Sequence, residues 1–322
     1  MSSDRERVER SILIYKTGLD VWRALNTEEV PSAYEGSIVV CVDGSDDDRS
    51  AVEWAVRLAQ HVHSSIRLVH ALPDVGKWFD PAVLIAGAQL ESELRRVGKK
   101  FLDDAALIVR NLDAEIEVEC SITGGAATDL IESISTNSRL LILGGSRTGP
   151  LRDLIFGHSI IELVNAAVCP VLVWRKSRDE SADPTRPIVV GVDGSQPSRR
   201  ALAAAFDLAR TLGADLVTVH VGAVEDADEL DYGTSVDRQH QRDAERKWLQ
   251  DIVGPYKSEY PTVAVEVRSV GASVARELGT MSASAQVIAV GSRGRGRLSS
   301  AILGSVSQSL IHRAQCPVLV VP

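Results

Sequence analysis

The feature that most constrains this fold is an internal repeat, because the main motifs of the chain occur twice. The stretch "IVVCVDGS" at Ile38 to Ser45 returns as "IVVGVDGS" at Ile188 to Ser195. The stretch "VCPVLVW", which begins at Val168, returns as "QCPVLVV" from Gln315. Solenoid repeats are much shorter than these units. The 322-residue chain is therefore expected to contain two homologous domains of ordinary size.

Within each repeat, short β-branched runs alternate with segments of helical periodicity. The run Ile188 to Val192 contains no polar residue, as expected of a strand buried on both faces of a parallel sheet. Ser195 and Pro197 then predict a helix start. The order predicts an α/β fold of two tandem, doubly wound, five-stranded parallel sheets of Rossmann-like type. In the second repeat the later strands are expected at 216–221, 263–267, 287–290 and 317–321, and the later helices at 238–253, 274–281 and 300–313.

The domain limits follow from the repeat and from the composition between its copies. Residues 36–175 form the first predicted domain, and residues 188–322 form the second. The segment 176–187 between them is charged and contains Pro184 and Pro187, so it is predicted to be a linker. Residues 1–35 have no counterpart in the second repeat. Their apolar residues favour a docking helix, with a disordered extension as the alternative.

Composition excludes several protein classes. A formal net charge of -9 argues against a nucleic-acid binder, which would carry a basic face. The charged N-terminus does not fit a signal peptide, and no apolar run is long enough to span a bilayer. The four cysteines contain no Cys-x-x-Cys pair and are expected to be small core thiols in a reducing compartment. We therefore expect a cytoplasmic protein without a membrane or nucleic-acid partner.

A stretch rich in glycine and arginine, "GSRGRGRLSSAILGS", runs from Gly291 to Ser305 directly after an apolar strand. Ligands of open parallel sheets bind beyond the carboxyl ends of the strands, where the strand order reverses. Glycines let a backbone approach an oxyanion closely, and a helix N-terminus favours an anion. The chain lacks a P-loop, a kinase motif set and a G-x-G-x-x-G turn. The stretch therefore predicts a polyphosphate cradle of another type.

The spacing Gly291-x2-Gly294-x9-Gly304-Ser305 resembles the G-x2-G-x9-G-[S/T] signature of the ATP-binding branch of universal stress proteins. The segments "VVGVDGS", "TVHV", "VGSRGRG" and "CPVLVV" match that family's strands in order. The chain is similar to tandem universal stress proteins of actinobacterial type, from about residue 36 to the C-terminus.

The resemblance implies ATP as the ligand, with Mg²⁺ held mainly by the phosphates and no metal site built by the protein. Gly191 and Asp193 would face the adenosine, and the backbone of Val221 would meet adenine. The other residues implied for the second repeat wrap ribose and phosphates, and they are Gly291, Ser292, Arg293, Gly294, Arg295, Gly296, Arg297, Gly304, Ser305, Val306 and Ser307.

The first repeat departs from this pattern. Thr148 stands where the second repeat has Gly294, His158 replaces Ser305, and Cys41 replaces Gly191. Each change removes a donor or fills space, so weaker, altered or absent nucleotide binding is predicted for this repeat. Its candidate site residues are Asp43, Ala71, Gly145, Ser146, Arg147, Gly157, His158 and Ser159.

Other tempting residues carry weaker signals. His61 and His63 end a predicted helix, and a helix-end or solvated position is favoured over a metal site. His70 and His220 occupy matching strand ends, where hydrogen bonds to the backbone are favoured over catalysis. The acidic run Glu225 to Asp231 is expected to be a solvated loop. The sequence therefore predicts no catalytic residue.

Three functions remain open at this stage. The favoured one is a stress-response protein that binds ATP as a signal rather than as fuel and acts through a regulatory protein partner. A slow ATPase lacks an evident general base. A nucleotide-independent scaffold does not explain the intact motif, and cyclic AMP is an alternative ligand.

The apolar strands of the two "CPVLV" segments need partners, and their pairing within one chain would give a pseudo-two-fold arrangement that resembles the family's dimer. Further association into a homodimer is left open.

Overall fold

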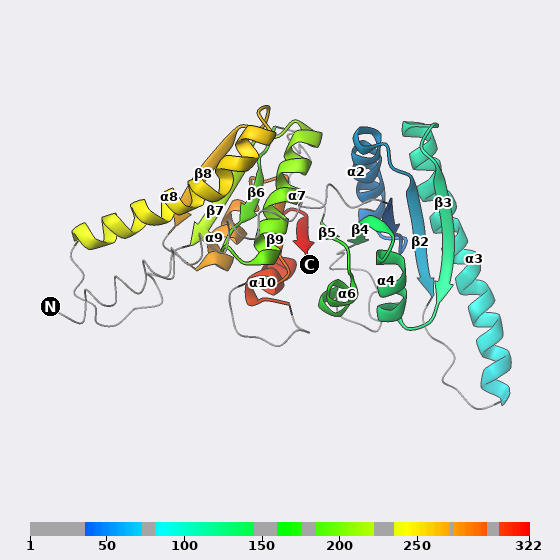
Figure 1. Ribbon diagram of the computed structural model, residues 1–322. Helices are drawn as coiled ribbons and strands as arrows, with labels where there is room; N and C mark the ends of the chain where they lie inside the picture. Colours follow the sequence, from blue (N-terminus) through cyan, green and yellow to red (C-terminus); the bar gives the residue numbers. More distant parts are fainter. Residues whose placement is uncertain are drawn as a thin grey trace. The chain divides into compact units, whose positions relative to one another are not determined.

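The computed structural model describes residues 36–72, 81–144, 160–175, 185–221, 235–270, 273–294 and 303–322, with side chains except at 81–88, 221 and 235–242. The predicted N-terminal extension and most of the linker lie outside this part of the chain. Within it, strands and helices alternate in both repeats, which confirms the α/β fold (Figure 1).

The first repeat contains β1 (Ser37–Cys41), α2 (Asp46–Val62), β2 (Ile66–Leu72), α3 (Pro81–Leu112), β3 (Val118–Gly124), α4 (Ala127–Ser135), β4 (Ser138–Gly144), α6 (Ile160–Ala166) and β5 (Val171–Trp174). The second repeat contains β6 (Ile188–Gly191), α7 (Gln196–Leu212), β7 (Leu216–Val221), α8 (Ser235–Glu259), β8 (Val265–Val270), α9 (Val274–Met281), β9 (Val287–Gly291), α10 (Ser305–Arg313) and β10 (Val318–Val321).

Most expected elements of the second repeat agree with the structure. Helix α10, expected from residue 300, begins at Ser305 after its N-cap Gly304. Two further elements differ for identifiable reasons. Helix α8 continues past Val253 and through Pro255, because Tyr256 stacks on Phe206 with the ring centroids 5.2 Å apart. Strand β8 begins two residues later than expected. Val263 is buried in the preceding turn, where its N–H donates to the carbonyl of Tyr260 at 3.1 Å.

The ten strands of the described residues form one sheet in the order β3-β2-β1-β4-β5-β10-β9-β6-β7-β8. All neighbouring strands run parallel except β5 and β10, which pair antiparallel with Leu172 opposite Leu319. The expected pairing of the two terminal strands is therefore confirmed. It joins the two expected five-stranded sheets into one and makes the strand order symmetric about the junction.

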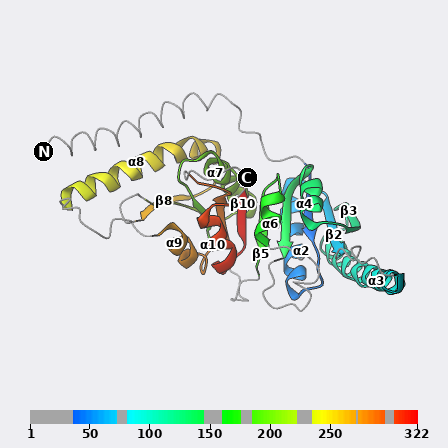
Figure 2. The ribbon, with the colours of Figure 1, turned by 90° about the horizontal axis from the view of Figure 1, so that it is seen from below.

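Alternating strand residues face two helical layers. Helices α2, α3, α7 and α8 contact one face of the sheet, whereas the residues of α4, α6, α9 and α10 share a single buried cluster with the other face. This cluster runs from Val171 and Val173 of β5 directly to Val318 and Val320 of β10. Figure 2 shows α10 beside β10. The hydrophobic core is therefore continuous across the two repeats.

The predicted start of α7 is confirmed in detail. Ser195 is the N-cap, its hydroxyl accepts the N–H of Ser198, and Pro197 lies in the first helical positions. Gly213 ends the helix in the left-handed conformation with φ 63°. These caps fix both ends of a helix that packs Ala205 and Phe206 into the core.

No helix of the described residues is long and apolar enough to cross a membrane. All four cysteines are free thiols. Cys169 and Cys316 are buried as expected, but Cys120 is exposed on the edge strand β3 and Cys41 is half-buried. The expectation of core thiols is therefore correct for two of the four.

The junction of β5 and β10 can be tested with a buried charge. Leu172 is 0% exposed, so Leu172→Asp places a carboxylate without a partner at the centre of the sheet. We expect the free energy of unfolding to fall by roughly 3 kcal/mol or more, measured by urea denaturation of the full chain.

The matched control is Val168→Asp, because Val168 lies a few residues away and is 54% exposed. It should change the free energy of unfolding by no more than about 0.5 kcal/mol. Equal stability losses in the two variants would contradict the buried junction.

Candidate functional site

The candidate site lies where the strand order of the second repeat reverses. From β6 the chain moves outward to β7 and β8, whereas β9 and β10 lie on the other side of β6. Strands β6 and β9 end at Gly191 and Gly291. Their carboxyl ends therefore form the switch point at which open α/β sheets bind ligands.

The turn after β6 is held by its own side chains. Gly194 has φ 82°, a left-handed conformation that favours glycine. The Asp193 carboxylate accepts the N–H of Ser195 at 2.9 Å. The hydroxyl of Ser198 accepts the N–H groups of Gly194 at 3.1 Å and of Asp193 at 3.4 Å. The turn is therefore fixed by one carboxylate and one neutral hydroxyl.

The loop after β9 packs directly against this turn. A Cβ atom at Gly291 would lie 2.7 Å from the backbone nitrogen of Ser198, so only glycine permits this close approach. A Cβ atom at Gly294 would lie 2.6 Å from Oδ2 of Asp193. The hydroxyl of Ser195 donates to the carbonyl of Arg293 at 3.3 Å. The turn after β6 and the loop after β9, which lie far apart in the sequence, therefore form one side of the candidate site together.

The start of α10 closes the other side of the loop. Gly304 is the N-cap, and its N–H donates to the carbonyl of Ser292 at 2.8 Å. The buried hydroxyl of Ser307 lies 3.2 Å from the same carbonyl. Ser305, Val306 and Ser307 form the first helical turn, whose N–H groups have no acceptor within the helix.

Two polar groups of this loop remain available to a ligand. Ser292 is 8% exposed, and among the described residues its hydroxyl has no hydrogen-bond partner. The side chain of Arg293 is exposed beside it. A buried hydroxyl, a cation and a helix N-terminus at one loop form a site suited to an anion with several oxygens.

The structure brings together most of the second repeat's predicted residues. Gly191, Asp193, Gly291 to Gly294 and Gly304 to Ser307 meet around the loop described above. Val221 ends β7, two positions beyond Val219, which pairs with Gly191. Arg295, Gly296 and Arg297 lie outside the described residues.

The two strand-end histidines have structural partners. Nδ1 of His220 lies 2.7 Å from the carbonyl of Val192, and Nδ1 of His70 lies 2.7 Å from the carbonyl of Val42. A carbonyl only accepts, so each Nδ1 donates. The expected backbone role is confirmed, and each histidine ties the end of its strand to the neighbouring turn.

The same turn in the first repeat is closed by a different residue. Gly44 has φ 81°, and the Asp43 carboxylate accepts the N–H of Ser45 at 2.9 Å, as in the second repeat. Here, however, Oδ2 of Asp48 accepts the N–H groups of Gly44 at 2.7 Å and of Asp43 at 3.1 Å. A carboxyl group therefore occupies the place of the Ser198 hydroxyl.

This exchange changes the electrostatics of the turn. Burial and, to a smaller extent, the nearby Asp43 carboxylate raise the pKa of Asp48 from 3.8 to about 7. Burial also raises the pKa of the Cys41 thiol to about 12, with added effects of Asp48 and Asp43. The thiol is therefore protonated at neutral pH, and Asp48 keeps its proton to a much higher pH than an ordinary aspartate.

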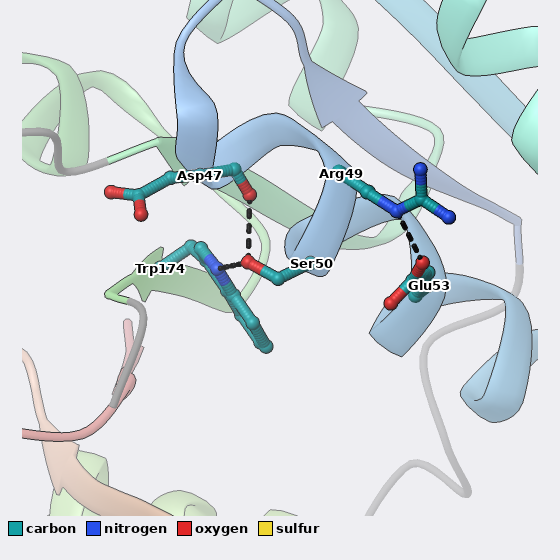
Figure 3. Close-up of polar contacts among 5 residues, drawn as sticks. All are labelled: Asp47, Arg49, Ser50, Glu53 and Trp174. Carbon is teal, nitrogen blue, oxygen red and sulfur yellow. Dashed lines mark hydrogen bonds and ion pairs between the residues drawn. The ribbon is translucent and has the colours of Figure 1, made fainter. Parts of the chain in front are cut away.

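The first turns of α2 hold the last strand of the repeat in place. The indole nitrogen of Trp174 donates to the hydroxyl of Ser50 at 2.9 Å, and Ser50 donates to the carbonyl of Asp47 at 2.9 Å (Figure 3). The Trp174 ring also packs on Trp54. On the exposed side of the helix, Arg49 pairs with Glu53 at 2.9 Å. The second repeat has Val321 at the place of Trp174, so this anchor belongs to the first repeat alone.

The structure describes only some of the site residues predicted for the first repeat. Asp43 lies in the turn, and Ala71 is buried near the end of β2. A side chain at the position of Gly191 points toward Leu278, because a Cβ atom there would lie 3.0 Å from its Cδ1. Cys41 correspondingly packs against the core, so the expectation that its side chain fills the space of a ligand is wrong. Gly145, Ser146, Arg147, Gly157, His158 and Ser159, as well as Thr148, lie outside the described residues.

The His61 and His63 pair lies at the end of α2. His63 is the left-handed C-cap with φ 50°, and Nδ1 of His61 lies 2.7 Å from the carbonyl of Arg57. Within the described ranges, no group of three or more His, Cys, Asp or Glu side chains could hold a metal ion. The acidic run at 225–231 lies outside those ranges.

Sequence reasoning missed Asp48 and Ser198. Both occupy the fifth position after the turn aspartate, in "DGSDDD" and "DGSQPS". Aligning the two repeats through this turn would have shown the exchange. The hydrogen bonds of the structure show why it matters.

Comparison with protein families assigns both repeats. A model described as the universal stress protein family matches residues 36–175 and 184–322. The two matched segments cover most of the chain.

Curated relatives share this tandem organisation over nearly their whole length. The chain is 32% identical over 292 residues to universal stress protein Rv2005c of Mycobacterium tuberculosis, covering 88% of this chain and 96% of the relative. It is 30% identical over 288 residues to universal stress protein Rv2623 of the same organism, covering 88% and 95%.

Solved structures support the fold. A universal stress protein from Archaeoglobus fulgidus matches with a TM-score of 0.64 and 19% identity, covering 90% of this chain and 97% of that chain. A protein of unknown function from Pseudomonas aeruginosa, PA1789, matches with a TM-score of 0.54 and 18% identity, covering 90% and 92%.

The elevated pKa of Asp48 predicts a specific pH dependence of stability. The folded state holds this proton more tightly than the unfolded state, so stability is greatest at low pH and falls as pH rises from about 4 to about 7. Asp48→Asn keeps an oxygen that can accept both N–H groups but cannot ionise. Relative to this variant, the wild type should lose on the order of 3 kcal/mol between pH 4 and pH 8, measured by urea unfolding.

Asp46→Asn is the matched control, because Asp46 is exposed in the same helical turn. Its stability profile should run parallel to that of the wild type. A parallel profile for Asp48→Asn as well would show that Asp48 does not titrate with an elevated pKa.

Proposed function

The chain belongs to the universal stress protein family, and on that basis we propose that its second repeat binds ATP as a regulatory ligand. The supporting observation is the arrangement around Ser292. Its buried hydroxyl lacks a partner among the described residues, and its carbonyl joins the loop to the N-terminus of α10. Backbone N–H groups, hydroxyls and Arg293 can then surround the phosphate oxygens.

The adenosine end would lie over β6 and β7. Gly191 ends β6, and β7 continues two residues further to Val221. The backbone of this overhang can donate to and accept from the edge of adenine. Asp193 lies between the two ends of the site, in reach of a ribose.

Magnesium fits this proposal as a partner of the phosphates. Mg²⁺ keeps several waters and commonly binds through substrate phosphates with one or two carboxylates. Asp193 is the carboxylate of the described turn that lies against the phosphate loop. No metal cage built by the protein is required.

The surroundings of the Asp193 carboxylate favour ATP as a bound signal over ATP as a substrate that is hydrolysed. Oδ1 of Asp193 already accepts the N–H of Ser195, and the backbone of the loop lies close to Oδ2, since a Cβ atom at Gly294 would lie 2.6 Å from it. A general base must reach the attacking water with an available oxygen. We therefore propose that bound ATP persists and that its occupancy controls a regulatory protein partner of the stress response.

Retention of intact ATP tests this role. Full-length protein loaded with ATP and Mg²⁺ should still hold unhydrolysed ATP after several hours at 25 °C, measured by chromatography of the released nucleotide and by free phosphate. Phosphate release within minutes would favour a slow ATPase. Failure to bind ATP, with binding of cyclic AMP instead, would identify a different ligand.

The phosphate end can be tested by removing one charge. Arg293→Ala should lower the affinity for ATP at least 10-fold and reduce its dependence on salt, because Arg293 is an exposed cation of the loop. Isothermal titration of the full chain measures both effects.

The control variant is Arg313→Ala, since Arg313 is an exposed arginine at the other end of α10. It should bind ATP with the affinity of the wild type. Equal affinities of all three proteins would place the phosphates elsewhere.

A further inference from the structure

The two repeats close one turn with side chains of different charge. In the first repeat, both backbone N–H groups donate to a single oxygen of Asp48, at 2.7 and 3.1 Å. In the second repeat, the same two groups donate to the Ser198 hydroxyl at 3.1 and 3.4 Å. The backbone conformations match, since Gly44 and Gly194 have φ values of 81° and 82°. The difference is therefore one of charge rather than of shape.

The first repeat surrounds this carboxyl with further acidic groups. Asp43 lies in the turn itself, and Asp46 and Asp47 precede Asp48 in the first turn of α2. The first turn of α7 contains no acidic residue. The N-terminus of α2 thus already carries three acidic residues in its first turn and follows a fourth, Asp43, which reduces its attraction for an external anion.

The position of Ser198 brings this charge difference to the phosphate loop. A Cβ atom at Gly291 would lie 2.7 Å from the nitrogen of Ser198, so residue 198 lies directly beneath the loop. The Ser195 hydroxyl joins the same turn to Arg293. A carboxylate at position 198 would therefore repel any polyphosphate held by this loop.

We propose that residues 48 and 198 decide which repeat accepts a polyphosphate. The carboxyl group of Asp48 satisfies the turn of the first repeat and, once ionised, excludes an external anion, whereas the neutral Ser198 leaves the second repeat open. The inference rests on the function proposed for the second repeat. It is independent of the changes at Thr148 and His158, which lie outside the described residues.

The experiment transfers the acidic residue into the open repeat of the full-length chain. Ser198→Asp is compared with Ser198→Asn, which has the same size but no charge. Titrations with ATP and Mg²⁺ are made at pH 8, above the pKa of about 7 that burial and Asp43 give to Asp48. We expect Ser198→Asp to bind ATP at least 30-fold more weakly than Ser198→Asn.

Lowering the pH provides a second readout. An acid at position 198 would meet the backbone of Asp193 and of Gly291, and the charged residues of the neighbouring turn and loop are Asp193 and Arg293. Protonation of the new carboxyl at pH 5.5 should narrow the gap between the Asp and Asn variants to less than 5-fold. A merely structural disturbance would leave the gap unchanged.

A milder pair keeps the test informative if Ser198→Asp does not fold. Gln196 is exposed in the same turn and corresponds to Asp46. Gln196→Asp should bind ATP at least 3-fold more weakly than Gln196→Asn at pH 8. Circular dichroism establishes folding of each variant before titration.

The outcomes separate this inference from the proposed function. Wild-type protein that fails to bind ATP overturns both. Wild-type protein that binds ATP, together with equal affinities of the Asp and Asn variants, overturns the inference alone. A loss confined to the acidic variants, reversed at low pH, supports it.

Discussion

The antiparallel pairing of β5 with β10 is the interaction on which the rest of the structure depends. Both strands are buried on both faces, so each would expose an apolar edge if its repeat stood alone. Their pairing removes both edges and lets one core cluster run from Val171 to Val320. With these two central strands paired, β4 and β9 hold the neighbouring positions, and the switch points beside β1 and β6 keep their geometry.

Much of this fold could be predicted from the sequence because the repeat states each signal twice. The runs around Val190 and Val217 are uninterrupted and β-branched, and Ser195 with Pro197 marks a helix start by local chemistry alone. Boundaries that depend on distant contacts were harder to predict. The extension of α8 to Glu259 relies on Phe206, which lies about fifty positions earlier in the chain. Local propensity at Pro255 gives the opposite signal.

The candidate site shows the same division. Glycine spacing predicted that Gly291, Gly294 and Gly304 belong together, and the structure brings them around Ser292. The sequence could not show that Gly291 needs its missing side chain because of the Ser198 backbone. Nor could it show that Asp48 turns inward to accept two N–H groups. In the sequence, Asp48 is one of three consecutive aspartates that read as a solvated helix start. Its burial and its two accepted hydrogen bonds distinguish it from Asp46 and Asp47.

Taken together, these contacts describe a pair of similar folds with unequal sites. One repeat offers a turn closed by a neutral hydroxyl, a buried hydroxyl and an exposed arginine to an anion. The other satisfies the same turn with its own carboxyl. The number of ATP molecules bound by one full-length chain tests this account most directly, measured by equilibrium dialysis with Mg²⁺ at saturating ATP. The account predicts one ATP per chain; two per chain, or none, would contradict it.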